Sequence, residues 1–198
     1  MEEIAPGIRH WTKQHPRIGM DVSSYFLPEL GVLIDPLTPP EGMDVLEELG
    51  PPREILLSNR HHWRECGELT ERFGVRVRAP RVGMHEFAEG DPVDPYDFGD
   101  ELAGGAIVVH EIGGICPDEA ALHIPSLNAL AVADGVIQYD GLRFVPDNLM
   151  EDPEGTKQAL KEAYALLADE LEFEHLLTAH GEPVVGGARD ALRAFATA

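Results

Sequence analysis

A short apolar run that opens into a histidine-rich turn is the feature that most constrains how this chain can fold. The run ends at Leu57 and is followed by S-N-R-H-H-W-R at positions 58 to 64. Residues 54 to 57 are too few and too apolar for an amphipathic helix, so they predict a buried strand. The chain must therefore hold a polar turn at the end of a strand in its core.

Around this strand, short apolar segments alternate with helical patterns, which predicts an α/β architecture in a single domain spanning residues 1–198. Strands are expected at 22–27, 32–34, 54–57, 75–79 and 106–110, and helices at 42–49, 65–73, 152–171 and 187–195. The first two strands form a hairpin, and Gly74 ends the second helix. Residues 80–105 are expected to be mostly loop with a short hairpin and to form a substrate-facing wall.

Composition excludes several classes of protein. The chain has 36 acidic and 15 basic residues, a net charge of −21 that would repel nucleic acid and anionic lipid. No apolar run approaches the roughly 18 residues of a membrane span, and the N-terminus lacks the pattern of a signal peptide. We therefore expect an acidic, cytoplasmic protein with no nucleic-acid or membrane partner. Cys66 and Cys116 are too few for a disulfide framework.

The turn at 58–64 resembles a motif of the metallo-β-lactamase superfamily, T-H-x-H-x-D-H after a buried strand. Ser58 takes the Thr position, Asn59 the first His, His61 the second His, Trp63 the Asp and Arg64 the last His. One metal ligand of four is retained. The resemblance implies a four-layer αββα sandwich of two mixed sheets flanked by helices, with the site at the rim between the sheets.

Later blocks of the chain continue the resemblance in family order. The segment E-I-G-G-I-C-P at 111–117 stands where the family has P-G-H-T-P-G, so Gly114 replaces the third-motif histidine. The segment L-A-V-A-D-G at 130–135 resembles the strand whose aspartate bridges two metals, and Asp134 is retained. The segment L-L-T-A-H-G at 176–181 resembles the last-strand P-G-H-G motif, and His180 is retained. The resemblance spans nearly the whole chain.

The retained ligands predict a degenerate site without two zinc ions. His61 and Asp134 remain for one metal, and Asp134 and His180 for the other, which is fewer than the three ligands of a catalytic zinc. Arg64 is expected to occupy the space of the lost ligand and to pair its guanidinium with Asp134, keeping that carboxylate ionised. We expect no bound metal and no other cofactor, since the sequence has no G-x-G-x-x-G after a strand and no P-loop.

Most other histidines are expected to be surface or packing residues. His62 alternates away from His61 on an extended turn, so it is expected to face the surface or the packing rather than a ligand. Cys116 is a substitute soft ligand or, more simply, a small buried thiol. Asp35 is expected to have a structural role in its turn.

Three functions remain open, with His61, Arg64, Asp134 and His180 as candidate site residues. The first is a degenerate family member that binds a small molecule in the rim cleft or has altered catalysis, with a homodimer as an open assembly. The second is a hydrolase of esters, thioesters or lactones that holds one zinc, iron or manganese ion through His61, Asp134 and His180, with His62 or Cys116 as a fourth ligand. The third is a metal-free enzyme with His61 or His180 as general base and Arg64 as anion stabiliser.

Overall fold

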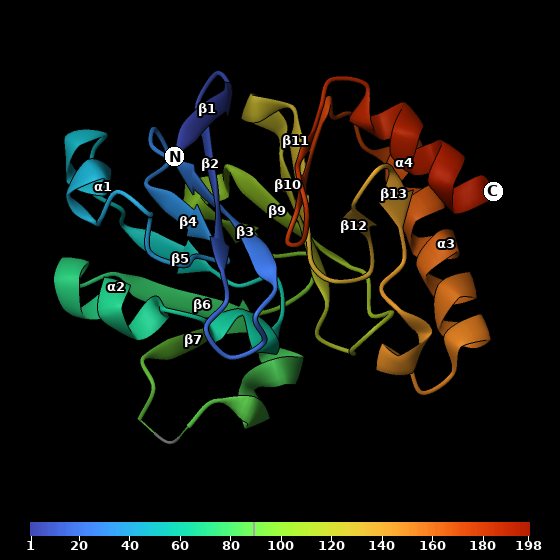
Figure 1. Ribbon diagram of the computed structural model, residues 1–198, viewed down its shortest axis with the longest axis horizontal. Helices are drawn as coiled ribbons and strands as arrows, with labels where there is room; N and C mark the ends of the chain where they lie inside the picture. The colour runs from blue at the N-terminus through green and yellow to red at the C-terminus, as the bar shows by residue number, and fades with distance from the viewer. Residues whose placement is uncertain (89) are drawn as a thin grey trace.

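Two large β-sheets face each other in the computed structural model, which describes residues 1–88 and 90–198 (Figure 1). The first sheet has seven strands in sequence order: β1 (Glu2–Ala5), β2 (Ile8–Gln14), β3 (Asp21–Leu27), β4 (Val32–Ile34), β5 (Glu54–Leu56), β6 (Arg76–Pro80) and β7 (Val93–Tyr96). Strands β1 to β4 are antiparallel, whereas β4 to β7 are parallel. The first sheet is therefore mixed.

The second sheet is also mixed and has six strands in the order β15-β14-β11-β10-β9-β8. Its members are β8 (Glu101–Leu102), β9 (Ile107–Glu111), β10 (Ala120–Ile124), β11 (Ala129–Val132), β14 (His175–Thr178) and β15 (Val184–Val185). Only the β11–β14 pair is parallel. A small separate hairpin joins β12 (Ile137–Gln138) to β13 (Leu142–Arg143).

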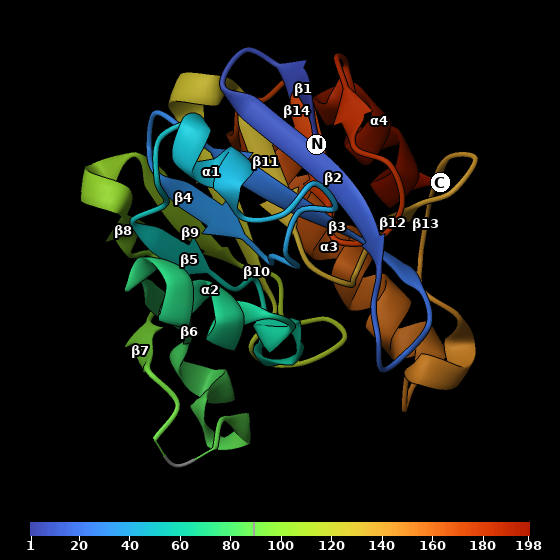
Figure 2. The same ribbon diagram turned by 60° about the vertical axis from the view of Figure 1, so that its left-hand side comes forward.

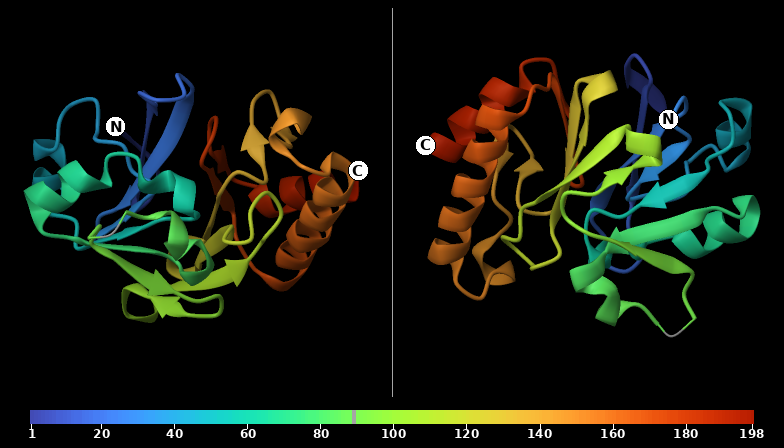
Figure 3. Two further views of the ribbon diagram at one scale, coloured as in Figure 1. Left: turned by 90° about the horizontal axis from the view of Figure 1, so that it is seen from below. Right: turned by 180° about the vertical axis from the view of Figure 1, so that it is seen from behind.

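Helices cover the outer face of each sheet (Figures 1 and 2). The helices α1 (Asp44–Glu48) and α2 (Cys66–Phe73) pack on the first sheet, and α3 (Pro153–Glu170) and α4 (Ala188–Thr197) pack on the second. Short 3₁₀ turns lie at Arg60–Trp63, Arg81–Glu86, Ala103–Gly105, Pro125–Leu127 and Asp147–Leu149. Seen from below, the two sheets stand between their helices (Figure 3).

Side-chain alternation along the strands builds three apolar layers from one sequence pattern. Tyr25 and Leu27 of β3 point into the space between the sheets, whereas Phe26 between them packs against the outer helices. The same alternation places Leu56 inside and Ile55 outside. Successive residues of a strand point to opposite faces, so strands buried on both faces must be apolar throughout. These layers confirm the predicted four-layer αββα sandwich.

The boundaries of the expected helices and strands are confirmed to within a few residues, with two exceptions. The N-terminal strands β1 and β2 were not predicted. Residues 80–105 do not contain a hairpin, because β7 pairs with β6 in the first sheet and β8 pairs with β9 in the second. This segment carries the chain from one sheet to the other, and residue 89 within it lies outside the described residues.

The rim of the sandwich collects residues that follow the carboxyl ends of strands. Asp35 follows β4, Ser58 follows β5, Asp134 follows β11 and His180 follows β14. The two sheets are joined here, because Ser23 of β3 donates its backbone N–H to the carbonyl of Ala179 at 2.9 Å. Residues from distant parts of the sequence thereby meet at one edge.

Two surface features complete the fold. None of the helices in the described part of the chain is long and apolar enough to cross a membrane. Phe144, in the apolar segment after β13, packs against Phe195 of α4 with ring centroids 4.6 Å apart and ring planes tilted by 51°. That ring therefore packs within the chain.

Candidate functional site

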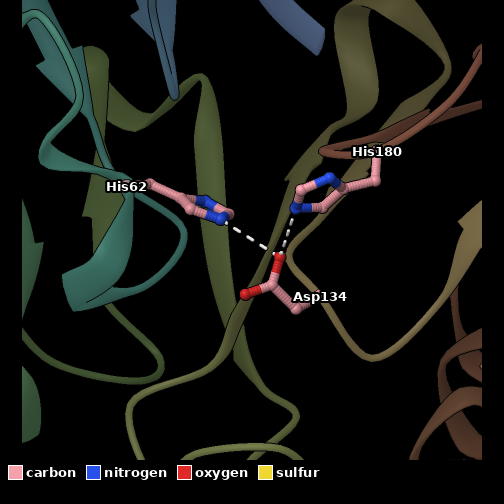
Figure 4. Close-up of side chains that lie close together, drawn as sticks. All are labelled: His62, Asp134 and His180. Carbon is pink, nitrogen blue, oxygen red and sulfur yellow. Dashed lines mark hydrogen bonds and ion pairs between the residues drawn. The ribbon is translucent and has the colours of Figure 1, made fainter. Parts of the chain in front are cut away.

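Two histidines point at one carboxylate at the rim (Figure 4). The Nε2 atom of His62 lies 3.1 Å from Oδ1 of Asp134, and the Nε2 atom of His180 lies 3.2 Å from the same oxygen. The other oxygen of Asp134 accepts a hydrogen bond of 2.9 Å from the Asn59 side chain. Three elements that are distant in sequence thus contribute to one polar cluster, and we call His62, Asp134 and His180 the rim cluster.

A second carboxylate holds His62 from behind. Oδ2 of Asp35 lies 3.0 Å from Nδ1 of His62, and the same nitrogen is 3.0 Å from the Ser58 hydroxyl. That hydroxyl donates to Oδ2 of Asp35 at 2.5 Å, and the Ser58 backbone N–H donates to Oδ1 at 2.8 Å. The imidazole is therefore fixed at both nitrogens, and its ring can turn only if these bonds break. Asp35 also adopts a positive φ of 47°, which is costly for a residue other than glycine.

His180 lacks such a partner. Its Nδ1 is buried and has no hydrogen-bond partner within residues 1–88 and 90–198. Its orientation comes from Asp134 and from the edge of the His62 ring, whose centroid lies 6.3 Å away. The two histidines are thus held unequally.

The charges of the cluster shift its pKa values in opposite directions. Burial alone would lower the pKa of His62, but the carboxylates of Asp35 and Asp134 raise it to about 9. Burial alone would raise the pKa of Asp134, but the charge of His62 and hydrogen bonds from both histidines hold it well below its usual range. His62 is accordingly an imidazolium between two carboxylates at neutral pH when nothing else is bound.

The structure corrects the prediction about the two adjacent histidines. His61 is exposed and contributes its backbone N–H to the Asn59 side chain at 2.9 Å, while His62 is buried and reaches Asp134. The prediction failed because the segment is a 3₁₀ turn and not extended. With three residues per turn, positions 59 and 62 share a face, and both side chains therefore bond Asp134.

Arg64 lies half-buried beside the cluster and does not pair with Asp134, contrary to the prediction. Its Nη1 donates to the carbonyl oxygens of Ser23, at 2.7 Å, and Asp35, and its Nη2 lies 3.5 Å from the carbonyl of Ala179. His62 and Asn59 occupy the positions around Asp134 that the prediction assigned to Arg64. Burial lowers the pKa of the Arg64 guanidinium.

The two acidic residues that follow segment 111–117 form a structural support. Asp118 is fully buried and accepts from both the backbone and the guanidinium of Arg60. Glu119 accepts from the backbone N–H groups of Ile115, at 3.0 Å, and Gly135. Burial and the nearby Asp134 raise the pKa of Glu119 to about 7.

The rim cluster opens into a cavity of about 620 Å³. His61 and Arg64 also line this cavity, together with Trp63 and residues 86–88 from the segment between the sheets. The expectation that residues 80–105 contribute a wall is therefore confirmed for these positions. All four predicted site residues reach the cavity, but His61 does so from outside the rim cluster.

Comparison with solved structures identifies the architecture. DIM-1 metallo-β-lactamase superposes with a TM-score of 0.74 at 15% identity, covering 99% of this chain and 95% of that one. A metallo-β-lactamase family protein from Thermus thermophilus superposes with a TM-score of 0.66 at 19% identity, over 98% of this chain and 78% of the other. The chain has the metallo-β-lactamase fold.

The fold also occurs as part of a larger relative. Rubredoxin:oxygen oxidoreductase from Desulfovibrio gigas gives a TM-score of 0.69 at 12% identity over 99% of this chain, which spans 60% of that protein. No protein-family model matches the sequence, and no curated protein matches it. At these identities the likeness establishes the metallo-β-lactamase fold and nothing about activity.

A pair of metal ions, as the metallo-β-lactamase fold implies, does not fit these residues. Gly114, at the position of the third-motif histidine, supplies no ligand, and a Cβ there would lie 2.1 Å from a side-chain carbon of Leu160, which would have to move. Trp63, at the position of the motif aspartate, packs its ring against Phe87 with centroids 6.0 Å apart. Arg64 adds a positive charge in the same region. A second divalent ion would therefore lack ligands and be repelled.

A single divalent ion does fit. One ligand atom from each of His62, Asp134 and His180 lies within 4.8 Å of the others, and no further group of this kind occurs among the described residues. Two imidazoles and a carboxylate suit zinc or ferrous iron, and three protein ligands leave a position open toward the cavity. The Asp35 carboxylate behind His62 matches the second sphere of metal-bound histidines. Cys116, the other substitute ligand considered, is not part of this group.

Proposed function

We propose that this protein is a hydrolase that holds one divalent metal ion in the rim cluster and cleaves an ester, thioester or lactone. The observation that carries the proposal is the convergence of two imidazole nitrogens and one carboxylate oxygen beside a cavity large enough for a small substrate. When bound, such an ion polarises a carbonyl oxygen and lowers the pKa of a bound water.

The residues of the chain have separate parts in this proposal. His62, Asp134 and His180 supply the ligand atoms, so His62 replaces His61 in the ligand set expected from the sequence. Asp35 and Ser58 hold the His62 ring so that its Nε2 faces the cavity. Asn59 fixes the second oxygen of Asp134, which leaves Oδ1 directed at the two imidazoles. A fixed ligand geometry is what a catalytic site needs from its surroundings.

The decisive experiment is the metal content of the purified, untagged protein. Elemental mass spectrometry would be run before and after incubation with zinc, manganese or ferrous iron followed by desalting. We expect about one ion per chain, since residues 1–88 and 90–198 hold one complete ligand set. The His62→Ala variant is expected to lose this ion.

The adjacent histidine provides a matched control. His61→Ala removes the same side chain one position away, and we expect it to retain the ion because its imidazole lies outside the rim cluster. Equal loss in both variants would contradict the assignment of His62. Absence of metal in the wild-type protein under every loading condition would overturn the proposal as a whole.

A specific observation favours one second candidate, a metal-free protein. His62 already carries a proton between Asp35 and Asp134, so the imidazolium can stand in for the missing cation. In that case His180 is the candidate general base and Arg64 the anion stabiliser, or the cavity only binds a small molecule. An apo protein that binds a ligand in this cavity, with loss of binding in His180→Ala, would support it.

A further inference from the structure

The rim cavity differs in charge from the rest of the molecule. The whole chain has 36 acidic and 15 basic residues. The cavity wall instead has three arginines, Arg17, Arg60 and Arg64, and three carboxylates, Glu86, Asp91 and Asp134, with four histidines in addition. Among the described lining residues, arginines and carboxylates are equal in number, so this part of the wall lacks the strong excess of negative charge that the whole chain has.

Among the described residues, neither Arg64 nor Arg17 of this wall has an ion-pair partner, but Arg17 is exposed whereas Arg64 is half-buried. The acceptors of Arg64 are backbone carbonyls, and no carboxylate of the described residues lies within ion-pair distance of its guanidinium. Arg60, by contrast, is paired with Asp118. A half-buried guanidinium without a carboxylate partner is a favourable site for a charge-assisted hydrogen bond to an anionic ligand.

The backbone at Arg64 indicates that this position is specially constrained. Its φ of 43° and ψ of −116° lie in a region that residues other than glycine rarely adopt. Such a conformation persists where the surrounding structure enforces it. The three carbonyls that hold the guanidinium lie in or directly after strands of both sheets, so they fix the side chain. The guanidinium still has N–H groups that can donate to a ligand. Arg has five N–H donors, and Nε has no acceptor within the described residues.

The guanidinium is also close to the proposed chemistry. Arg64 and Asp134 line the same cavity. We propose that Arg64 binds an anionic group of the substrate, so that the substrate class is an ester, thioester or lactone whose acyl part carries a carboxylate. This inference rests on the proposed function for the cleaved bond, but not for the anion site.

Binding of glutarate, a simple dicarboxylate, tests the anion site without any reaction. The titration would follow tryptophan fluorescence, because Trp63 lines the cavity, with dimethyl glutarate as the uncharged comparison. We expect Arg64→Gln to weaken glutarate binding by about tenfold or more, since a charge-assisted pair is lost. Arg17→Gln, which removes an exposed arginine of the same wall, is the matched control and should change binding by less than about threefold.

A conservative variant keeps the inference testable if Arg64→Gln does not fold. Arg64→Lys retains the charge, so a folded Lys variant that still binds glutarate would support the role of charge even if Arg64→Gln fails to fold. Unchanged glutarate binding in a folded Arg64→Gln protein, or equal binding of dimethyl glutarate to the wild type, would overturn the inference.

Hydrolysis then separates this inference from the proposed function. The paired substrates are 4-nitrophenyl acetate and the mono-4-nitrophenyl ester of glutaric acid. Preference for the glutarate ester that is lost in Arg64→Gln supports both ideas. Cleavage of the two esters at equal rates would leave the hydrolase proposal standing and overturn the anion site. Cleavage of neither ester, combined with Arg64-dependent glutarate binding, would support the anion site and count against the hydrolase proposal.

Discussion

His62 is the residue whose protonation controls the rim cluster. In the folded protein its pKa is raised to about 9, whereas the ordinary value is 6.5. A group with a raised folded pKa stabilises the protein fully below its unfolded pKa and loses that contribution as the pH rises through the folded pKa. The metal-free protein should therefore lose on the order of 3 kcal/mol from this group between about pH 6.5 and pH 9.

Urea unfolding with a chelator present would measure this loss across that pH window. The loss attributed to His62 is the difference between the wild type and His62→Gln, because other groups, such as Glu119 with its pKa raised to about 7, also titrate. His61→Ala should keep the wild-type slope. Parallel curves for wild type and His62→Gln would show that the imidazolium does not stabilise the fold.

At the scale of single residues, sequence reasoning found Asp134 and His180 but chose the wrong neighbour in the histidine pair. The motif comparison aligned His61 with a ligand, and alternation in an extended turn then excluded His62. The available signal was Asn59, a residue type that readily begins a helical turn, followed by a side chain three positions later. Such a turn places residues 59 and 62 on one face, which is what the structure has.

At the scale of elements, the turn after β14 depends on a glycine that holds His180 in place. Gly181 has a φ of 80°, and a Cβ there would lie 1.7 Å from the backbone oxygen of Gln138. The neighbouring backbone bond from Gln138 N–H to the His180 carbonyl is 3.1 Å long. Gly181→Ala must therefore push these two segments apart and move the His180 imidazole.

Gly186→Ala is the matched control for this substitution. Gly186 has a similar φ of 83°, but a Cβ there would meet nothing within 4 Å. We expect it to cost about 1 kcal/mol for the backbone alone, and Gly181→Ala to cost several kcal/mol and to lower metal content as well. Chemical unfolding with elemental analysis checks both, and equal effects of the two variants would contradict a role for the close approach.

Elements were more predictable than the way they are joined. The apolar runs predicted the strands, and their alternation with helical patterns predicted the α/β class, whereas the four layers followed from the resemblance to the metallo-β-lactamase superfamily. The path of residues 80–105 was not predictable, because β7 and β8 are short and their partners, β6 and β9, lie in different sheets. Pairing between segments depends on tertiary context that local composition does not record.

At the scale of the whole molecule, the net charge of −21 acts against the compact state. The exposed ion pairs oppose this only weakly. Arg81 and Asp97, for example, pair at 2.8 Å but are 57% and 52% exposed, so water and salt screen their attraction. Repulsion among the excess carboxylates should therefore outweigh the attraction of surface pairs.

Added salt should consequently stabilise this protein at neutral pH. The electrostatic screening length is much shorter at about 300 mM salt than at about 10 mM. Added salt therefore weakens the many repulsions between carboxylates more than the few attractions within surface ion pairs. We expect Tm at about pH 7.5 to rise by a few degrees over this range of sodium chloride. Near the sequence pI of about 4.6 the net charge vanishes, so the same salt should have little effect there. A comparable rise in Tm at both pH values would indicate that salt strengthens the burial of apolar surface and does not act by screening charge repulsion.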